Sequence, residues 1–444
     1  MNRSPLTRRR FAGGLAQAMF AAGLAPQVVR AQTVGLGGGT AANSRVGVAH
    51  IGTGGQGTGL LRNFLNSSLH QPVVICDPYQ ERREAAGQVV KEKRGQAPEL
   101  AGDFREVVKR QDVEACVIAT PDHWHVPVAL AAVRSGKDIY VEKPLGLSLN
   151  ENRKLMEACL ANKRVFQYGT MQRSQGHMRK GVELVLNGAF GKIQRLDVWA
   201  PGGISGGSLD EIPVPPGLNY DLYIGPAPMK PCTKDRITNN GSYHCSDYAL
   251  GFIAGWGAHP LDIAIWGFQS DQAGPWKVKG TGEFPGPGLF DACKEWDADI
   301  TFADGLTMKF QSGNKAKDRV MAYRKDWQGD GTTFHGTDGW ISLSRGGFDS
   351  SKIDLMRGEA GKGPKTVRYQ PNYYEGFLKA VRSREPGLTP IEDAVRSDAF
   401  SHLALLAIKE AKELTWDPKA YRITAPEGLD AKMERACRAP YGLG

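Results

Sequence analysis

The stretch Arg45-Val46-Gly47-Val48-Ala49-His50-Ile51-Gly52-Thr53-Gly54-Gly55-Gln56-Gly57 decides the fold. A short β-rich run ends in a G-x-G-x-x-G turn, and an apolar-periodic stretch to Leu69 follows it as a helix. In such a turn Gly52 allows the tight bend, Gly54 the approach of a diphosphate and Gly57 the packing of helix on strand. The helix N-terminus favours negative charge. We therefore expect a dinucleotide site at the six turn residues Gly52, Thr53, Gly54, Gly55, Gln56 and Gly57.

A carboxylate follows the next predicted strand, residues 72–76. Asp77 stands twenty positions after Gly57, where a dinucleotide fold places the acid that binds the adenosine ribose hydroxyls. An acid at this position repels a 2′-phosphate, so the sequence favours NAD over NADP. Arg82 and Arg83 are the residues that could reverse this preference. A Rossmann-like domain that binds no nucleotide is the alternative.

Strands and helices continue to alternate up to residue 141, with helices over 80–94 and 104–110 and strands over 115–119 and 138–141. In open α/β sheets ligands bind beyond the carboxyl ends of the strands. The residues after three strands should therefore meet in one crevice, and five of them are expected at the cofactor: Thr120, Pro121, His125, Glu142 and Lys143. His123 and His125 have chelating spacing but lack a third ligand nearby, so we expect no metal.

The second half of the chain predicts a different sheet. Residues 192–199, 296–302, 306–311 and 339–344 alternate apolar and polar positions, as in strands of an antiparallel sheet with one covered face. An amphipathic helix is expected over 391–414. The fold class is α/β, with an N-terminal Rossmann dinucleotide-binding domain (45–165) and a C-terminal α+β domain with a large, mostly antiparallel open sheet (166–414). Residues 415–444 are expected to form a C-terminal tail.

Composition limits the classes of partner. The 444 residues are 41% hydrophobic and 23% charged, which supports two folded domains. Five arginines and no acid stand in the first 31 residues, so the net charge of +9 falls to +4 in the rest. This small surplus gives no reason to expect nucleic acid or an anionic membrane, and favours a small-molecule partner. The seven cysteines lack C-x-x-C spacing, which argues against zinc. Cys232 and Cys245 either pair as a disulfide or remain free thiols.

The first 31 residues read as an export signal. Thr7-Arg8-Arg9-Arg10-Phe11 precedes a weakly apolar run and the sequence Val29-Arg30-Ala31, a pattern that resembles a bacterial twin-arginine (Tat) signal peptide. We expect cleavage near Ala31, a flexible leader over 32–44, and a periplasmic or otherwise exported protein without a membrane anchor after processing. An amphipathic N-terminal arm is the alternative.

Three motifs together resemble the Gfo/Idh/MocA oxidoreductase family, and the resemblance extends from Arg45 to about Leu414. They are Thr120-Pro121-Asp122-His123-Trp124-His125, Ala131-Ala132-Val133-Arg134-Ser135-Gly136-Lys137 and Val141-Glu142-Lys143-Pro144-Leu145. The resemblance implies that Lys143 stands between the nicotinamide and the substrate hydroxyl, and that the bond before Pro144 is cis. It also implies a carbohydrate substrate and a homo-oligomer formed through the exposed sheet face.

The same resemblance points to Gly255-Trp256-Gly257-Ala258-His259-Pro260-Leu261-Asp262. Family members usually carry an acid four residues before this histidine and use the histidine as general base, a role that suits an imidazole with a pKa near 6.5. Here Gly255 takes the place of the acid, so Asp262, Asp247 or Asp221 supplies it, or none does. We expect His259 to be catalytic, with a hydrogen-bonded core histidine as the alternative. Three further side chains are expected to bind substrate: Gln172, Arg173 and Asp262.

Three functions remain open from the sequence. The first is an exported NAD(P)-dependent oxidoreductase that acts on a secondary hydroxyl of a sugar, polyol or glycoside and keeps its cofactor bound, because exported proteins meet little free NAD. The second is a redox-neutral glycosidase that oxidises, eliminates, adds water and reduces again. The third is a non-catalytic sugar- or nucleotide-binding protein, suggested by Gly255.

Overall fold

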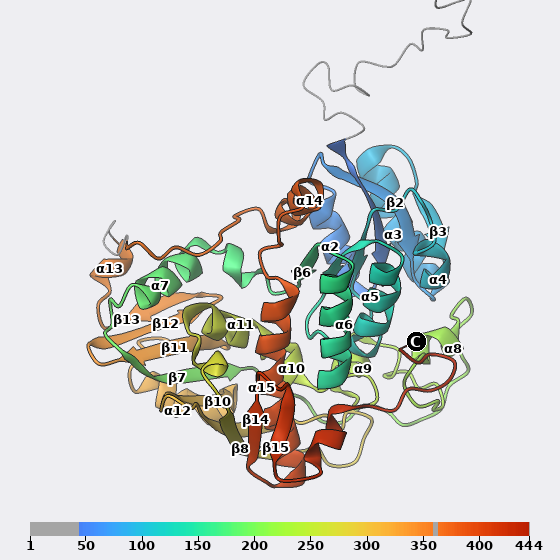
Figure 1. Ribbon diagram of the computed structural model, residues 1–444. Coiled ribbons are helices and arrows are strands. Elements are labelled where there is room, and N and C mark those ends of the chain that lie inside the picture. Colours follow the sequence, from blue (N-terminus) through green and yellow to red (C-terminus); the bar gives the residue numbers. More distant parts are fainter. Residues whose placement is uncertain (1–43, 358–362, 444) are drawn as a thin grey trace, which may run out of the picture. The chain divides into compact units, whose positions relative to one another are not determined.

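A parallel six-stranded sheet forms the first half of the computed structural model, which describes residues 44–357 and 363–443 (Figure 1). The expected signal and the leader up to residue 43 lie outside these ranges. The strand order is β3-β2-β1-β4-β5-β6. Successive strands are added on one side up to β3 and on the other side from β4 onward, and this switch between β1 and β4 creates a ligand crevice in doubly wound sheets. The strands are β1 (Val46–Ile51), β2 (His70–Cys76), β3 (Glu99–Ala101), β4 (Ala115–Ile118), β5 (Asp138–Val141) and β6 (Phe166–Tyr168).

Helices cover both faces of this sheet. They are α2 (Gly55–Phe64), α3 (Gln80–Arg94), α4 (Phe104–Val107), α5 (His125–Arg134) and α6 (Leu149–Ala161). One more comes from far along the chain: α14 (Tyr373–Ser383) places Phe377 and Val381 against Val46 and Phe64 in a shared core. The first sheet therefore extends past the expected boundary at residue 165 and depends on a helix from the second half.

The second sheet has nine strands in the order β13-β12-β11-β7-β10-β9-β8-β14-β15, and only β7 and β10 are parallel. This confirms the predicted fold class. The strands are β7 (Ile193–Ala200), β8 (Trp276–Glu283), β9 (Glu295–Thr301), β10 (Thr307–Ser312), β11 (Gly331–Gly336), β12 (Gly339–Ser344), β13 (Gly347–Ser350), β14 (Leu414–Asp417) and β15 (Arg422–Ala425).

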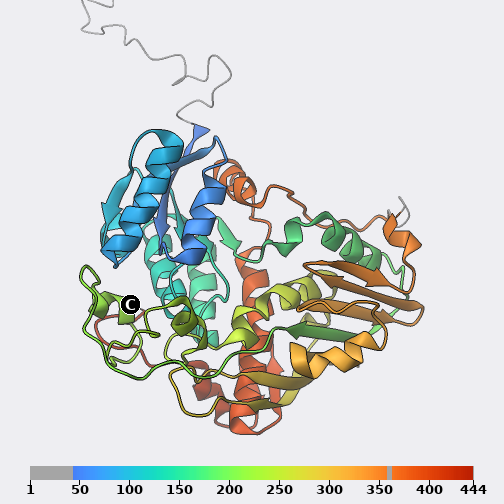
Figure 2. The same ribbon diagram turned by 180° about the vertical axis from the view of Figure 1, so that it is seen from behind.

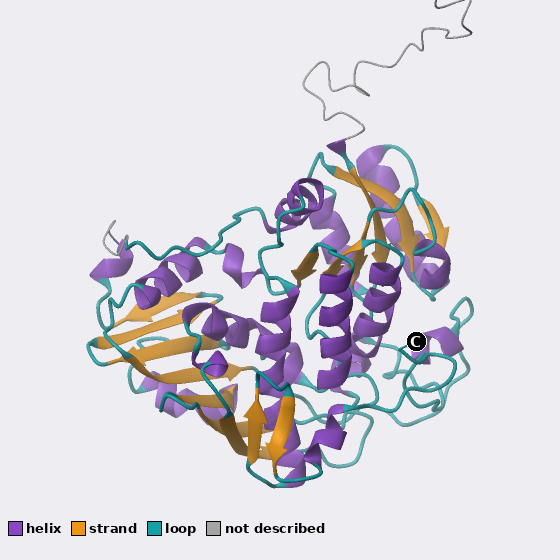
Figure 3. Ribbon diagram, viewed as in Figure 1, coloured by secondary structure: helices purple, strands orange, loops and turns teal. Residues whose placement is uncertain are grey.

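One face of this sheet packs on α7 (Gly176–Leu186), α11 (Ala258–Gly267) and α15 (Ile391–Glu410), and α12 (Gly313–Met321) packs on the other (Figure 3). The helix α15 belongs to both cores, because Ala394 packs with the first domain and Phe400 with the second. Most of its residues are buried. The predicted packing helix is thus a bridge between the two cores, and it is buried over more of its surface than an amphipathic helix requires.

The C-terminal residues differ from the expected tail. The helix ends at Glu410, where Ala411 adopts a left-handed backbone with φ of 50°, and Leu414 already belongs to β14. Both β14 and β15 continue the second sheet beyond β8. The sequence predicted helix up to residue 414, which includes the first residue of β14. Strands of only four residues give little periodic signal, so β14 and β15 were not predicted.

Residues 201–250 contain little regular structure. They include the short helices α8 (Tyr220–Ile224) and α9 (Asn239–His244), and α10 (Phe252–Gly255) follows them. Figure 2 shows this stretch, in green, below the first sheet. It pairs with the loop after β2, because Tyr79 bridges Leu218, the Gln80 N–H donates to the Gly217 carbonyl at 2.9 Å, and the Asn219 N–H donates to the Pro78 carbonyl at 3.0 Å. Within the described residues, no helix is both long and apolar enough to cross a bilayer.

Candidate functional site

The glycine turn has the shape that a diphosphate requires. Gly52 has φ of +84°, and a Cβ there would lie 2.6 Å from the backbone of Ala119. A Cβ on Gly57 would lie 2.0 Å from the Gly52 carbonyl oxygen, so helix α2 packs on the turn only because residue 57 has no side chain. No side chain caps α2. Its first N–H groups are therefore available to an anion.

Asp77 lies directly after β2 and is almost fully buried. Its Oδ2 accepts hydrogen bonds from the Thr53 N–H at 2.8 Å and the Thr53 hydroxyl at 3.3 Å, and its Oδ1 accepts one from the Tyr79 N–H at 2.9 Å. Burial raises the pKa of Asp77, while these hydrogen bonds and the charge of Arg82 oppose the rise. An apolar slot adjoins this carboxylate and is lined by residues that include Ile51, Pro78, Phe104, Trp124, Leu222 and Tyr223. Its apolar lining and its position beside Asp77 suit a nucleobase next to a ribose.

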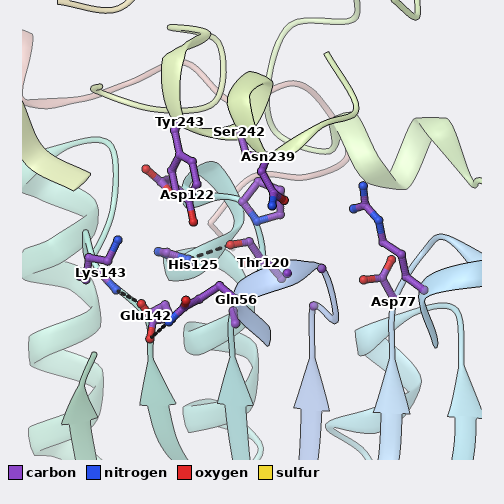
Figure 4. Close-up of a pocket in the computed structure, with 16 residues that line it drawn as sticks. Gln56, Asp77, Thr120, Asp122, His125, Glu142, Lys143, Asn239, Ser242 and Tyr243 are labelled. Carbon is purple, nitrogen blue, oxygen red and sulfur yellow. Dashed lines mark hydrogen bonds between the residues drawn. The ribbon is translucent and has the colours of Figure 1, made fainter. Parts of the chain in front are cut away.

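A neighbouring pocket of about 50 Å³ extends along the carboxyl ends of the strands (Figure 4). Most of the residues predicted at the cofactor line it: Gly52, Gly54, Gly55, Gln56, Asp77, Thr120, Pro121, His125, Glu142 and Lys143. Of the predicted set, Thr53 and Gly57 are absent from the lining and instead support the turn. Six residues outside that set also line it: Arg82, Ala119, Asp122, Asn239, Ser242 and Tyr243.

In the Glu142-Lys143-Pro144 motif, Glu142 makes structural hydrogen bonds and Lys143 lines the pocket. Glu142 Oε1 accepts hydrogen bonds from Gln56 Nε2 at 3.1 Å and from the Tyr140 hydroxyl at 3.2 Å, which ties the end of β5 to helix α2. Burial raises the pKa of Glu142. The Lys143–Pro144 bond is cis, as the resemblance implied. Lys143 Nζ lies 5.5 Å from the centre of the Tyr243 ring and has no ion pair within the described residues.

His125 connects two strand ends. Its Nδ1 lies 2.6 Å from the Pro144 carbonyl oxygen and its Nε2 lies 2.9 Å from the Thr120 carbonyl oxygen. Burial lowers the pKa of His125 to about 4, so the ring is neutral and donates to one of these carbonyls at a time. The side chain therefore holds the loops of the pocket in place. The described residues contain no cluster of three or more His, Cys, Asp and Glu side chains suited to a metal ion.

His259 lies at the start of α11 and is 5% exposed. Burial, together with the charges of Lys143 and Arg345, lowers the pKa of His259 well below its ordinary value. Its Nδ1 is buried and has no hydrogen-bond partner within the described part of the chain. The ring is thus a neutral imidazole that lies within the electrostatic reach of Lys143.

None of the three acids considered from the sequence contacts His259. Asp262 pairs with Arg173, Asp247 pairs with Lys230 and Arg236, and Asp221 binds Arg438 and Tyr441. The position of the usual acid, Gly255, would accept a Cβ without a clash, since the nearest atom to that Cβ is Phe252 Cδ1 at 3.9 Å. The missing partner of His259 is therefore not replaced from these positions.

Arg173 and Asp262, which are expected to bind substrate, form a buried ion pair with each other. Arg173 Nη2 donates to Asp262 Oδ1 at 2.6 Å and Nε donates to Oδ2 at 2.9 Å, and both side chains are at most 2% exposed. Asp262 also accepts from the Thr170 hydroxyl at 2.9 Å, and Arg173 reaches Asp393 of α15 at 2.7 Å. The pair joins α11 and α15 to the turn after β6. The third expected residue, Gln172, donates to Asp330 at 2.9 Å.

Several pocket residues gave no sequence signal. Asn239, Ser242 and Tyr243 lie on a six-residue helix inside an irregular stretch, and only the fold brings them over the glycine turn. Cys232 and Cys245 are both buried free thiols, so the disulfide that the sequence left open is not formed.

A glycine turn before α2, an acid after β2 and a lysine after β5 converge on one crevice, which defines a dinucleotide-binding α/β protein with a second, mostly antiparallel domain. The chain belongs to the Gfo/Idh/MocA oxidoreductase family. The family's NAD-binding Rossmann fold matches residues 46–170, and its C-terminal alpha/beta domain matches residues 199–443.

Curated relatives match only part of the chain. A glycosyl hydrolase family 109 protein of Saccharopolyspora erythraea is 32% identical over 157 residues, which is 34% of each chain. An alpha-N-acetylgalactosaminidase of Shewanella oneidensis is 34% identical over 110 residues, or 24% of each chain. The chain thus aligns with about a third or less of the length of these relatives.

Solved structures of low identity share the fold. A putative myo-inositol dehydrogenase from Sinorhizobium meliloti is 15% identical with a TM-score of 0.54, and the match covers 83% of this chain and 98% of that one. GenD2 from gentamicin A biosynthesis, solved in complex with NAD, is 17% identical with a TM-score of 0.59, covering 85% and 98%.

Proposed function

We propose that the protein is an NAD-dependent oxidoreductase that acts on a secondary hydroxyl of a sugar, polyol or glycoside. The observation that carries this proposal is the position of Lys143, an unpaired cation at the crevice of the glycine turn, close enough to the neutral His259 to lower its pKa. A positioned cation and a neutral imidazole are the two groups that removal of a hydride and a proton from an alcohol requires.

The residues of the first domain fit the dinucleotide. The N-terminus of α2 would hold the diphosphate, and Asp77 would bind the adenosine ribose and repel a 2′-phosphate, which favours NAD over NADP. When bound, NAD supplies the hydride acceptor. Lys143 then donates a hydrogen bond to the substrate hydroxyl oxygen and stabilises the negative charge that develops there. His259 accepts the hydroxyl proton.

The protein is further proposed to act after export through the twin-arginine route, in the periplasm, without a membrane anchor and as a homo-oligomer. Residues 1–31 support the export route. Retention of the cofactor gains support from the segment over the glycine turn: Arg82 Nη2 donates to the Ile237 carbonyl at 2.8 Å, and the Asn239 side chain would lie 3.0 Å from a Cβ on Gly55.

A redox-neutral glycoside hydrolase is the second candidate, favoured by the similarity to the family 109 relatives. In this reaction the hydride taken from a ring carbon would return to it. Between the two transfers, the bond to the aglycone would break by elimination and water would add at the anomeric carbon. Lys143 and His259 would keep the same tasks at the oxidised carbon.

The test uses protein purified after export without added cofactor. Nucleotide released on denaturation is identified, and absorbance near 340 nm is followed while sugars and glycosides are added. We expect bound NAD and a reduced band with at least one sugar. Cleaved glycoside without net NADH would select the hydrolase. Protein that neither contains NAD nor binds it on addition would overturn both candidates and leave a non-catalytic binding protein.

Lys143→Met is the matched variant. It should keep the bound nucleotide and lose turnover by a factor of 100 or more, because general acid–base and electrostatic contributions are of about this size. Lys91→Met, on the exposed side of α3, removes the same charge and should leave turnover unchanged.

A further inference from the structure

Arg345 is a cation of the second sheet that the proposed function does not use. It follows β12 directly, and its Cζ lies 4.7 Å from the centre of the Trp256 ring. That indole in turn contacts the catalytic candidate His259, with ring centroids 5.7 Å apart. The guanidinium is therefore separated from His259 by a single aromatic side chain.

The half-buried guanidinium has no ion-pair partner among the described residues, which distinguishes it from other arginines of this region. Arg173 and Arg396 each pair with aspartates, and Arg324 donates to the Ser342 hydroxyl at 2.8 Å. By contrast, Nε of Arg345 is buried without an acceptor, and no described carboxylate lies within 4.0 Å of its guanidinium.

One described carboxylate, that of Asp330, lies within the electrostatic reach of Arg345. Asp330 senses the charge of Arg345, which lowers its pKa against the opposing effect of burial. Asp330 Oδ2 accepts the hydrogen bond from Gln172 Nε2 at 2.9 Å, and the backbone N–H of Arg345 also lowers the pKa of this carboxylate. Arg345 and Lys143 are thus two cations near His259 that form no ion pair among the described residues, and both lower the pKa of His259.

Two cations that form no ion pair are costly at a partly buried site unless a ligand supplies an anion. Arginine is suited to this because its planar fork binds carboxylate or phosphate oxygens through two parallel hydrogen bonds. We propose that Arg345, held against Trp256, binds an oxyanion substituent of the substrate while Lys143 and His259 act on its hydroxyl. The substrate class is thus an acidic sugar or glycoside: a uronic acid, or a sulfate or phosphate ester. This inference rests on the proposed function.

The experiment compares matched substrates on the NAD-loaded enzyme. Each pair shares a ring and differs at one carbon: a methyl glucoside or galactoside against the corresponding methyl uronide, its 6-sulfate and its 6-phosphate. We expect kcat/KM to be at least tenfold higher for one acidic series than for the neutral glycosides. The three acidic series reveal which oxyanion the site accepts.

Variants assign the preference to the side chain. Arg345→Gln should lower kcat/KM for the acidic substrate by about 10- to 100-fold, the range of a lost charged hydrogen bond, and change the neutral one less than threefold. Arg345→Lys should restore part of the preference. Lys325→Gln, an exposed charge on the segment between α12 and β11, is the control and should change neither.

The outcomes separate this inference from the proposed function. Turnover of neutral sugars with no acidic preference, or an equal loss for both series in Arg345→Gln, overturns the role of Arg345 and leaves the oxidoreductase intact. Absence of turnover with every sugar overturns the function. In that case calorimetric titration with the same pairs decides on Arg345: selective binding of the acidic partner that Arg345→Gln removes supports it, and equal or absent binding refutes it.

Discussion

Arg82 donates a hydrogen bond from Nη2 to the carbonyl oxygen of Ile237 across 2.8 Å, and so fastens the helix after Asp77 to the segment above the glycine turn. The next residues of that segment, including Asn239, line the dinucleotide pocket. Release of a bound dinucleotide would require this segment to move away from the turn.

Arg82→Gln should therefore accelerate loss of bound NAD. A hydrogen bond to a charged donor contributes about 1.5–3 kcal/mol, so we expect dissociation to become at least tenfold faster. Dilution of the holoenzyme into an excess of NAD-consuming enzyme measures the rate. Lys91→Gln on the exposed face of the same helix is the control, and equal release rates in both variants would contradict a retaining role for the contact.

The pH dependence of turnover should report the surroundings of His259. Its pKa is held well below 6.5, so the imidazole stays neutral and competent to accept a proton, and kcat/KM should show no acid limb near pH 6.5. Gly255→Asp places its Cβ without a clash and adds a negative charge, which raises the pKa of His259 and moves the acid limb upward. Gly255→Asn separates charge from size. An unchanged pH profile in Gly255→Asp would show that a charge at residue 255 does not alter the pKa of His259.

Substitution of Asp262 should lower the free energy of unfolding more than it changes substrate binding. Asp262→Asn leaves Arg173 buried with one carboxylate fewer, and breaking a buried pair in this way costs about 3–5 kcal/mol of unfolding free energy. The double substitution Arg173→Met, Asp262→Leu should cost less, because no buried charge remains. Urea unfolding measures both. If Asp262→Asn raised KM at unchanged stability, the substrate role predicted from the sequence would stand and the structural one would fall.

The buried pair His50 and His70 should make the first domain sensitive to acid. Their Nε2 atoms lie 3.0 Å apart, so one ring donates to the other, and the accepting ring must be neutral. Burial lowers the pKa of His50 to about 3 and that of His70 well below 6.5. In the unfolded chain these two histidines bind protons near pH 6.5, whereas in the folded chain they remain neutral at that pH. Their effect on stability is therefore constant above pH 6.5, and stability falls as the pH drops from there toward 3.

His50→Gln removes one of these two titrating groups. It should flatten the decline of unfolding free energy between pH 6.5 and 5, by at most about 1.4 kcal/mol per pH unit. Other groups change stability with pH in the opposite direction, such as Asp398, whose pKa is raised by burial to about 7. Their contribution is the same in the wild type and the variant, so it cancels when the two proteins are compared. Parallel curves for the two proteins would exclude the pair as a source of acid sensitivity.

The local chemistry of the chain was sufficient to predict the dinucleotide half. Gly52, Gly57 and Asp77 each satisfy a requirement that acts within one strand, turn and helix, and the structure places them accordingly. Arg173 and Asp262 show the limit of such reasoning. The sequence indicates polar residues near a predicted site, but whether they face a ligand or each other depends on the packing of helices that are distant in the chain.

The role of residues that lie outside any periodic pattern could not be predicted from the sequence. Asn239 and Tyr243 lie in an irregular stretch, and Arg345 follows a short strand, so no spacing links any of them to the glycine turn or to His259. The strands β14 and β15 were missed for a similar reason. Their identity as strands comes from pairing with β8, which no local pattern encodes.

The same pairing has a consequence for how the molecule is made. The second sheet is finished only when β14 aligns with β8, and Arg438 then reaches Asp221, a residue 217 positions earlier. A nascent chain on the ribosome cannot close these long-range contacts until nearly all of it has been synthesised. The sheet edge at β8 therefore stays open throughout translation, and the second domain is completed as a late event that involves the whole polypeptide.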